Sequence, residues 1–183
     1  TGNVTIGDDS ASPKVNGGSF TLAGTGTIKI TDGAYCDSLT INNGGTTTLL
    51  GSVTTSGNQT YKNAVASSGG TLTGVNISFE NTASVAGGTI SGADITFTGA
   101  ASFTDDISVT STGLIKFVST GTISDTKTLT VTGNFENTGN VSGGNLKFTG
   151  ATGSEYTIKP TGNITSEIEI DTAGKESLAY ELN

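Results

Sequence analysis

Histidine, methionine, tryptophan and arginine are absent from the 183 residues, and there is a single cysteine, Cys36. Without histidine, zinc or haem sites built on imidazole ligands are excluded. One cysteine forms no intrachain disulfide, so the fold must draw its stability from packing and backbone pairing. The sequence also lacks an apolar run of the roughly 20 residues that a membrane-spanning helix needs.

Charge is scarce and mostly negative. Charged residues make up 13% of the chain, and the formal net charge is −8. Nucleic-acid-binding proteins carry clustered basic residues that displace counterions, and anionic membranes attract basic segments. We therefore expect no nucleic-acid partner, and a membrane link only through a part of the protein outside this sequence.

Threonine, glycine and serine dominate, with 35, 28 and 20 copies respectively. Threonine and the other β-branched residues favour extended backbone. Short runs alternate apolar and polar residues, as in 19–24, 75–80, 94–99 and 128–134, with Gly and Asn between them. Such alternation places one set of side chains in a core and the other in water. An all-β chain is predicted.

Aromatic residues recur at a nearly constant interval. Six of them follow one another with similar spacing along the chain: Tyr61, Phe79, Phe97, Phe117, Phe135 and Tyr156. A rhythm of about 20 residues is typical of a solenoid, in which each winding places an equivalent side chain over the one below. We predict a single-stranded parallel β-helix of roughly nine or ten coils, with these six residues as a stacked structural ladder. A β-sandwich is the alternative.

One phrase occurs twice. Phe79–Gly88 and Phe135–Gly144 share seven of ten residues, and an FTG ending follows each copy, five residues sooner in the second. In a solenoid this indicates two equivalent coils, the second with a shortened loop or side. Asn81 and Asn137, equivalent in the two copies, are expected at structural corners, because asparagine tolerates left-handed backbone.

The whole chain, 1–183, is predicted to be one β-helix domain and a fragment of a longer protein. Residues 155–183 are more acidic and less repetitive than the rest. They are expected to form a less regular C-terminal cap, of the kind that closes the open end of a coil stack.

Asp8–Asp9 and Asp105–Asp106 are the only adjacent acidic pairs. Carbohydrate-active β-helix enzymes use clustered carboxylates, commonly beside a histidine, arginine or lysine side chain. Adjacent residues on a strand point to opposite faces, so neither acidic pair would converge on one site. We therefore predict no catalytic residue, no cofactor and no metal site. Asp105 and Asp106 are the first candidates should a cation bind, and Cys36 is expected to be a free, partly buried thiol.

The motif Thr-x-Thr occurs nine times. Some threonine-rich solenoids present flat ranks of this motif to ice. Here the number is close to what chance predicts for so much threonine, and the intervals are uneven. The sequence therefore predicts no in-register array and no ice binding.

Three stretches carry a family resemblance: TTSGNQTYKNAV (54–65), GGTLTG (69–74) and the two FENT copies. Over about residues 40–150 they resemble the repeat regions of bacterial filamentous haemagglutinin-like exoproteins and the passengers of autotransporters. The resemblance implies a β-helix at a Gram-negative cell surface, exported through an outer-membrane transporter. The Asn-rich export motifs of that family are not evident here, which suggests an internal stalk piece.

The expected function is accordingly a structural and adhesive stalk segment of a secreted, extracellular bacterial surface protein. Its repetitive polar face would attach to a host receptor or glycan, and it is not expected to be an enzyme. Two alternatives stay open: a polysaccharide hydrolase or lyase on a β-helix, and an inert spacer.

Overall fold

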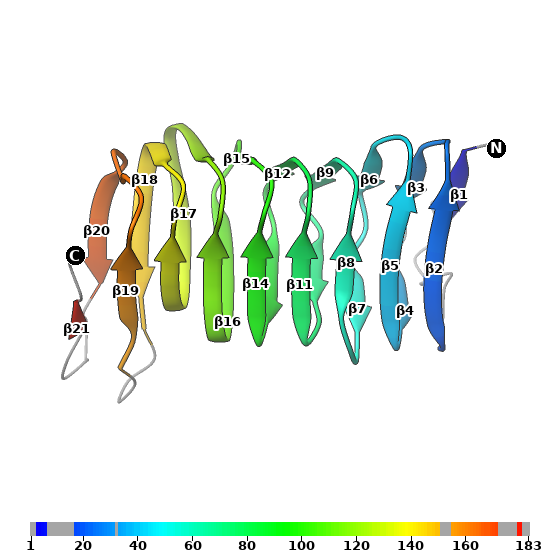
Figure 1. The fold of residues 1–183 in the computed structure, drawn as a ribbon, viewed down its shortest axis with the longest axis horizontal. Helices are drawn as coiled ribbons and strands as arrows, with labels where there is room; N and C mark the ends of the chain where they lie inside the picture. Colours follow the sequence, from blue (N-terminus) through cyan, green and yellow to red (C-terminus); the bar gives the residue numbers. More distant parts are fainter. Residues whose placement is uncertain (1–2, 7–16, 32, 151–154, 172–178, 181–183) are drawn as a thin grey trace.

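The structure, a computed structural model, describes residues 3–6, 17–31, 33–150, 155–171 and 179–180. This part of the chain is a parallel β-solenoid of about eight turns without a helix (Figure 1). The β-helix prediction is thus confirmed, and the sandwich, which needs antiparallel sheets, is excluded. The number of turns is lower than the nine or ten expected. No helix in the described residues is long and apolar enough to cross a membrane.

Turns of unequal length explain the lower number. Ile77 pairs with Ile95, whereas Phe135 pairs with Ile158, which is a larger step along the chain. Corner loops absorb the difference while the paired strands keep their register. The turn that was expected to be shortened is therefore one of the longer ones.

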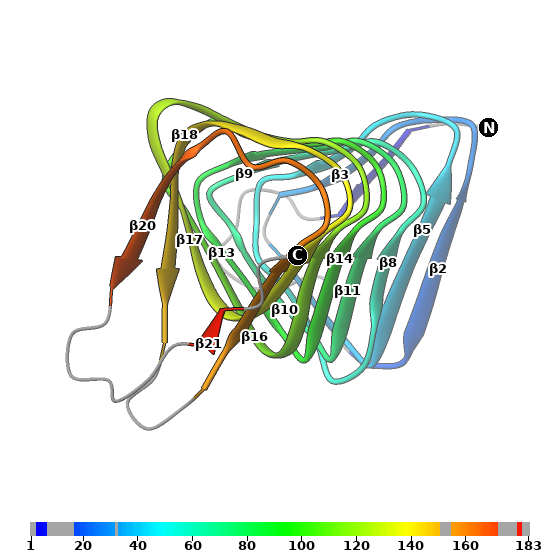
Figure 2. The same cartoon turned by 60° about the vertical axis from the view of Figure 1, so that its left-hand side comes forward.

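Each turn has three sides, which appear in Figure 2 as the edges of the nested windings. The first side contains β2 (Ser19–Gly24), β5 (Ser38–Asn43), β8 (Gln59–Tyr61), β11 (Asn76–Phe79), β14 (Asp94–Phe97), β19 (Thr157–Pro160) and β21 (Ala179–Tyr180). The second side contains β1 (Val4–Ile6), β3 (Ile28–Ile30), β6 (Thr47–Leu49), β9 (Val65–Ser68), β12 (Ala83–Ala86) and β15 (Ala101–Phe103). The third side contains β4 (Ala34–Cys36), β7 (Val53–Thr55), β10 (Thr71–Thr73), β13 (Thr89–Gly92) and β20 (Glu167–Asp171).

Three long strands run around the corners between sides. β16 (Ile107–Phe117) covers the third side and then the first, and β17 (Gly121–Asn137) covers the second, third and first in turn. β18 (Val141–Thr149) covers the second and third sides. Figure 2 shows β18 and β20 lying outside the outline of the earlier windings.

Stacked aromatic rings fill the interior of the central turns. Tyr61, Phe79, Phe97 and Phe117 occupy one register position on the first side and are almost completely buried. Successive ring centroids lie 5.2, 4.9 and 4.8 Å apart, with interplanar angles of 10°, 5° and 14°. These distances lie within the range of favourable offset stacking. Phe103, from the second side, packs edge-on against two rings of the column and lies outside the sequence rhythm.

The other two predicted members of the ladder lie elsewhere. On the next turn the residue that pairs with Phe117 is Asn137. Phe135 pairs instead with Ile115, two residues before Phe117 on β16. The Phe135 ring is therefore tilted by 45° against Phe117. In the next turn Ile158 pairs with Phe135, and Tyr156 lies two residues before it, at a groove that Asn134 and Glu155 also line.

A two-residue slip between the FENT copies causes this difference. The sequence copies align Phe135 with Phe79, but the residue that reaches the position of Phe79 three turns later is Asn137, two residues further on. Gly143 likewise takes the position of Val85. Because side chains alternate with a period of two, the slip leaves inward residues pointing inward.

The described part of the predicted cap continues the solenoid. β19 pairs with β17, β20 with β18, and β21 with β19. The other residues of 155–183, namely 172–178 and 181–183, lie outside the described residues.

Candidate functional site

The carboxylates of Asp105 and Asp106 each form a hydrogen bond to the next turn of the solenoid. Asp105 Oδ1 accepts a hydrogen bond of 2.6 Å from Lys127 Nζ. This bond, and a second one from the Asp106 N–H, lower the pKa of Asp105. Asp106 Oδ1 accepts the backbone N–H of Thr128 at 2.8 Å. The pair thus joins β16 to β17. Asp8–Asp9 lies outside the described residues.

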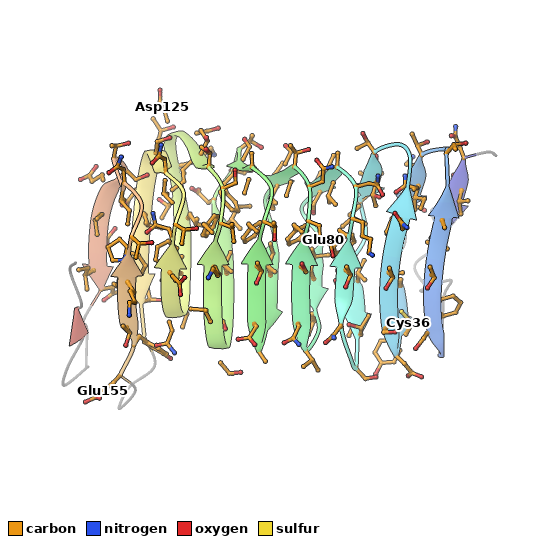
Figure 3. All side chains as sticks on the ribbon, in the orientation of Figure 1. Cys36, Glu80, Asp125 and Glu155 are labelled. Carbon is orange, nitrogen blue, oxygen red and sulfur yellow. The ribbon has the colours of Figure 1, made fainter. Side chains whose placement is uncertain are left out.

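Among the other described acidic side chains, Glu169 and Asp171 meet at Lys147, at 2.8 and 3.7 Å, and three further ones lie far apart along the tube. In Figure 3 Asp125 projects from the top of the tube, Glu155 lies at its bottom, and Glu80 lies near its middle. Within the described ranges, no three Asp, Glu, Cys or His side chains come together as a potential metal site. General acid–base catalysis needs two groups aimed at one reacting centre, and these three carboxylates offer none.

Cys36 is a buried thiol on the third side. It is 2% exposed, more buried than the sequence suggested, and its Sγ lies 3.5 Å from the carbonyl oxygen of Ser38. Burial raises the pKa of the thiol, and the nearby charge of Asp37 raises it further. A thiol with a raised pKa carries little thiolate at neutral pH, which makes it a poor nucleophile.

Side chains at the corners bond to the backbone, and several of them are residues that the FENT comparison did not indicate. Asn58, Asp94 and Asn134 each accept the backbone N–H of a residue one turn further on, at 3.3, 2.9 and 2.9 Å. Asn81 lies at the corner between β11 and β12, where its Oδ1 accepts the Thr82 N–H, and Asn137 ends β17, where its amide donates to the Gly139 carbonyl oxygen in the following corner. Both residues thus lie at corners as expected, but the two-residue slip gives them different register positions.

The third side carries a two-dimensional array of hydroxyl side chains. On four consecutive turns, two outward positions per strand hold only threonine or serine, and the backbone register aligns them in two columns. These eight residues, called the hydroxyl array below, are Thr71, Thr73, Thr89, Ser91, Ser108, Thr110, Thr130 and Thr132. One column extends to Thr54 before the array and to Thr149 after it.

The prediction that no in-register array exists is therefore wrong. Two signals hid it. Serine replaces threonine at Ser91 and Ser108, so a search for Thr-x-Thr misses those turns. The intervals along one column also vary, because Thr132 follows Thr110 at a longer distance in the sequence than Ser91 follows Thr73. Loops at the corners hold the extra residues, while pairing keeps the strands aligned.

The first side lacks such an array. Its middle column holds one hydroxyl per turn at Thr21, Thr40, Thr60, Ser78 and Thr96, but it continues with Lys116 and Glu136, which form an ion pair at 2.6 Å. The exposed charges of Lys62 and Glu80 directly follow β8 and β11. The first side thus carries a single column of hydroxyls that ends in charge, whereas the third side carries two neutral columns over four turns.

Comparison with known proteins adds no assignment: no protein-family model, no curated protein and no solved structure matches the chain.

Proposed function

We propose that the chain is a structural and adhesive stalk segment of a secreted bacterial cell-surface protein. The observation that supports the stalk is the continuity of the parallel pairing. Strands of all three sides pair with both neighbours through the central turns, from β5 to β17. In such a stack each turn is held by its neighbours, and repetition extends the rod without a new core.

The outward composition supports the adhesive part. Threonine and serine recur at outward positions of the central turns, and a surface that repeats one chemistry can bind one ligand at several points. The proposed ligand is a host receptor or glycan. The resemblance to filamentous haemagglutinin-like exoproteins agrees with this location, and export through an outer-membrane transporter is part of the proposal.

A binding experiment tests the adhesive part. The labelled full chain is applied to a glycan array and to host cells, and we expect saturable binding. One turn offers three matched variants, because Ser78, Ser84 and Ser91 are outward residues on its first, second and third sides. Replacing each by tyrosine blocks one side at a time, so loss of binding in a single variant identifies the adhesive side.

Two results contradict the proposal. Absence of binding to every glycan and cell type removes the adhesive function and leaves a spacer. Release of reducing ends from a polysaccharide panel, abolished by Asp105→Asn or Asp106→Asn, establishes an enzyme instead. Small-angle scattering checks the rod independently, because an elongated particle is expected whatever the ligand.

A further inference from the structure

The hydroxyl array has a regular lattice geometry. Paired strands lie about 4.8 Å apart, and side chains two residues apart on one strand are separated by about 6.6 Å. The backbone register fixes both directions, because Thr71 pairs with Thr89 and Thr73 with Ser91, and so on through four turns. The result is a rectangular grid of hydroxyl groups.

The hydroxyls of the array are available to a partner. All eight residues are exposed or partly exposed. Within the described part of the chain, only the Thr132 hydroxyl has a protein partner, the hydroxyl of Thr149 at 2.6 Å. After the last turn of the hydroxyl array the next residue in one column is charged. Lys147 pairs with Thr130, and its Nζ donates a hydrogen bond of 2.8 Å to Glu169.

The grid is also rigid. Between each pair of hydroxyl residues one apolar side chain points into the core and is at most 1% exposed: Leu72, Ile90, Val109 and Val131. Threonine has a restricted χ1 angle because its β-carbon is branched. A preorganised surface loses little conformational entropy when it binds, which favours a partner that is itself ordered.

The chemistry of the grid narrows the partner. It has no charged residue to attract an anionic polymer or a lipid headgroup, and no aromatic ring on which a sugar could stack. Each threonine offers one methyl group and one hydroxyl, which together order neighbouring water. The oxygen repeat along the a axis of hexagonal ice is close to the strand spacing of about 4.8 Å. An uncharged lattice of water is the partner that matches the array in charge and, along the axis of the solenoid, in spacing.

We propose that the hydroxyl array is an ice-binding surface, on which ordered water held by the hydroxyl and methyl groups joins the lattice of an ice crystal. The proposal does not depend on adhesion to a host. It assigns the third side to ice and leaves the first and second sides outside the contact.

Thermal hysteresis of the purified full chain tests this. The freezing point of a solution containing a single ice crystal is expected to fall below its melting point, with faceted crystal growth, and the gap should increase with protein concentration. Ser91→Tyr places a large ring in the middle of the grid and is expected to abolish the gap. Ser78→Tyr, on the first side of the same turn, is the matched control and should retain it.

A second variant separates binding from folding. Thr110→Val keeps the shape and removes one hydroxyl, so a smaller gap is expected with unchanged far-ultraviolet circular dichroism. Wild-type protein without hysteresis, or equal loss in Ser91→Tyr and Ser78→Tyr with both folded, overturns the proposal. Binding to insoluble neutral polysaccharide that Ser91→Tyr abolishes, without any hysteresis, also overturns it and assigns the array to a carbohydrate.

Discussion

The central turns, residues 59–117, and the later turns, residues 121–150 and 155–171, are stabilised by different interactions. In the central turns four aromatic rings form a column, and the outward positions of the third side are neutral. In the later turns the column passes to Asn137, and ion pairs connect successive strands, as between Lys147 and Glu169. The same backbone pairing thus supports an apolar and a partly electrostatic version of one turn.

The comparison shows which contribution to the stability of the fold depends on pH. Burial of apolar surface contributes about 25 cal/mol per Å² and varies little with pH. Exposed ion pairs contribute far less than a buried ring does, and they weaken when either partner loses its charge. We therefore expect the later turns to open first under acid, and the central turns to determine resistance to denaturant.

The largest effect is expected from Phe97→Ala. Its ring has stacked neighbours on both sides and Phe103 at its edge, so truncation should cost about 3–5 kcal/mol in the free energy of unfolding. Phe135→Ala is the matched control, because Phe135 is equally buried but has no stacked partner, being tilted against Phe117 and edge-on to Phe148. Its cost should be lower by about 0.5–1.5 kcal/mol, the contribution of a favourable aromatic pair. Urea titration measures both, and equal losses would contradict the importance of stacking.

A smaller effect is expected from Asn137→Ala. The Asn137 side chain is buried and donates a hydrogen bond of 2.7 Å to the carbonyl oxygen of Gly139. Removing it leaves that partly buried carbonyl without this donor, but it also removes Asn137 Oδ1, which is buried without a hydrogen-bond partner, so a net cost of about 0.5–1.5 kcal/mol is expected. The loss should appear as faster hydrogen exchange at β17 and β19, with the central turns unchanged. Faster exchange in the central turns instead would show that the two regions open as one unit.

The smallest effect concerns acid. A hydrogen bond from Lys147 lowers the pKa of Glu169, and one from Lys127 lowers the pKa of Asp105. A carboxylate with a lowered pKa stabilises the fold fully above its ordinary pKa, and this contribution is lost as the pH falls through the lowered value. Exchange at β18 and β20 should therefore increase below about pH 4, before exchange at β11 and β14. Glu169→Gln should remove part of this pH dependence, and an unchanged profile would count against the ion pair.

The sequence allows prediction of the fold class and of most of the column, because aromatic spacing reports the pairing wherever successive turns keep nearly the same length. It misplaced Phe135 and Tyr156 because a loop insertion and an even slip cannot be distinguished by counting residues. The hydroxyl array could not be predicted from the sequence for a related reason. Alignment of Thr110 with Thr132 depends on two extra residues between Ile123 and Leu129, compared with the corner between Phe103 and Ile107 one turn earlier, and only the three-dimensional pairing shows where those residues lie.

The slip between the FENT copies has a consequence for how such a rod evolves. A segment copied into a strand keeps its core as long as the displacement is an even number of residues, whereas an odd displacement turns the whole segment inside out. Insertions at corners escape this parity rule. Growth of the rod by duplication is therefore tolerant of imperfect copies, and drift between neighbouring turns leaves the tube intact while it changes which side chains meet.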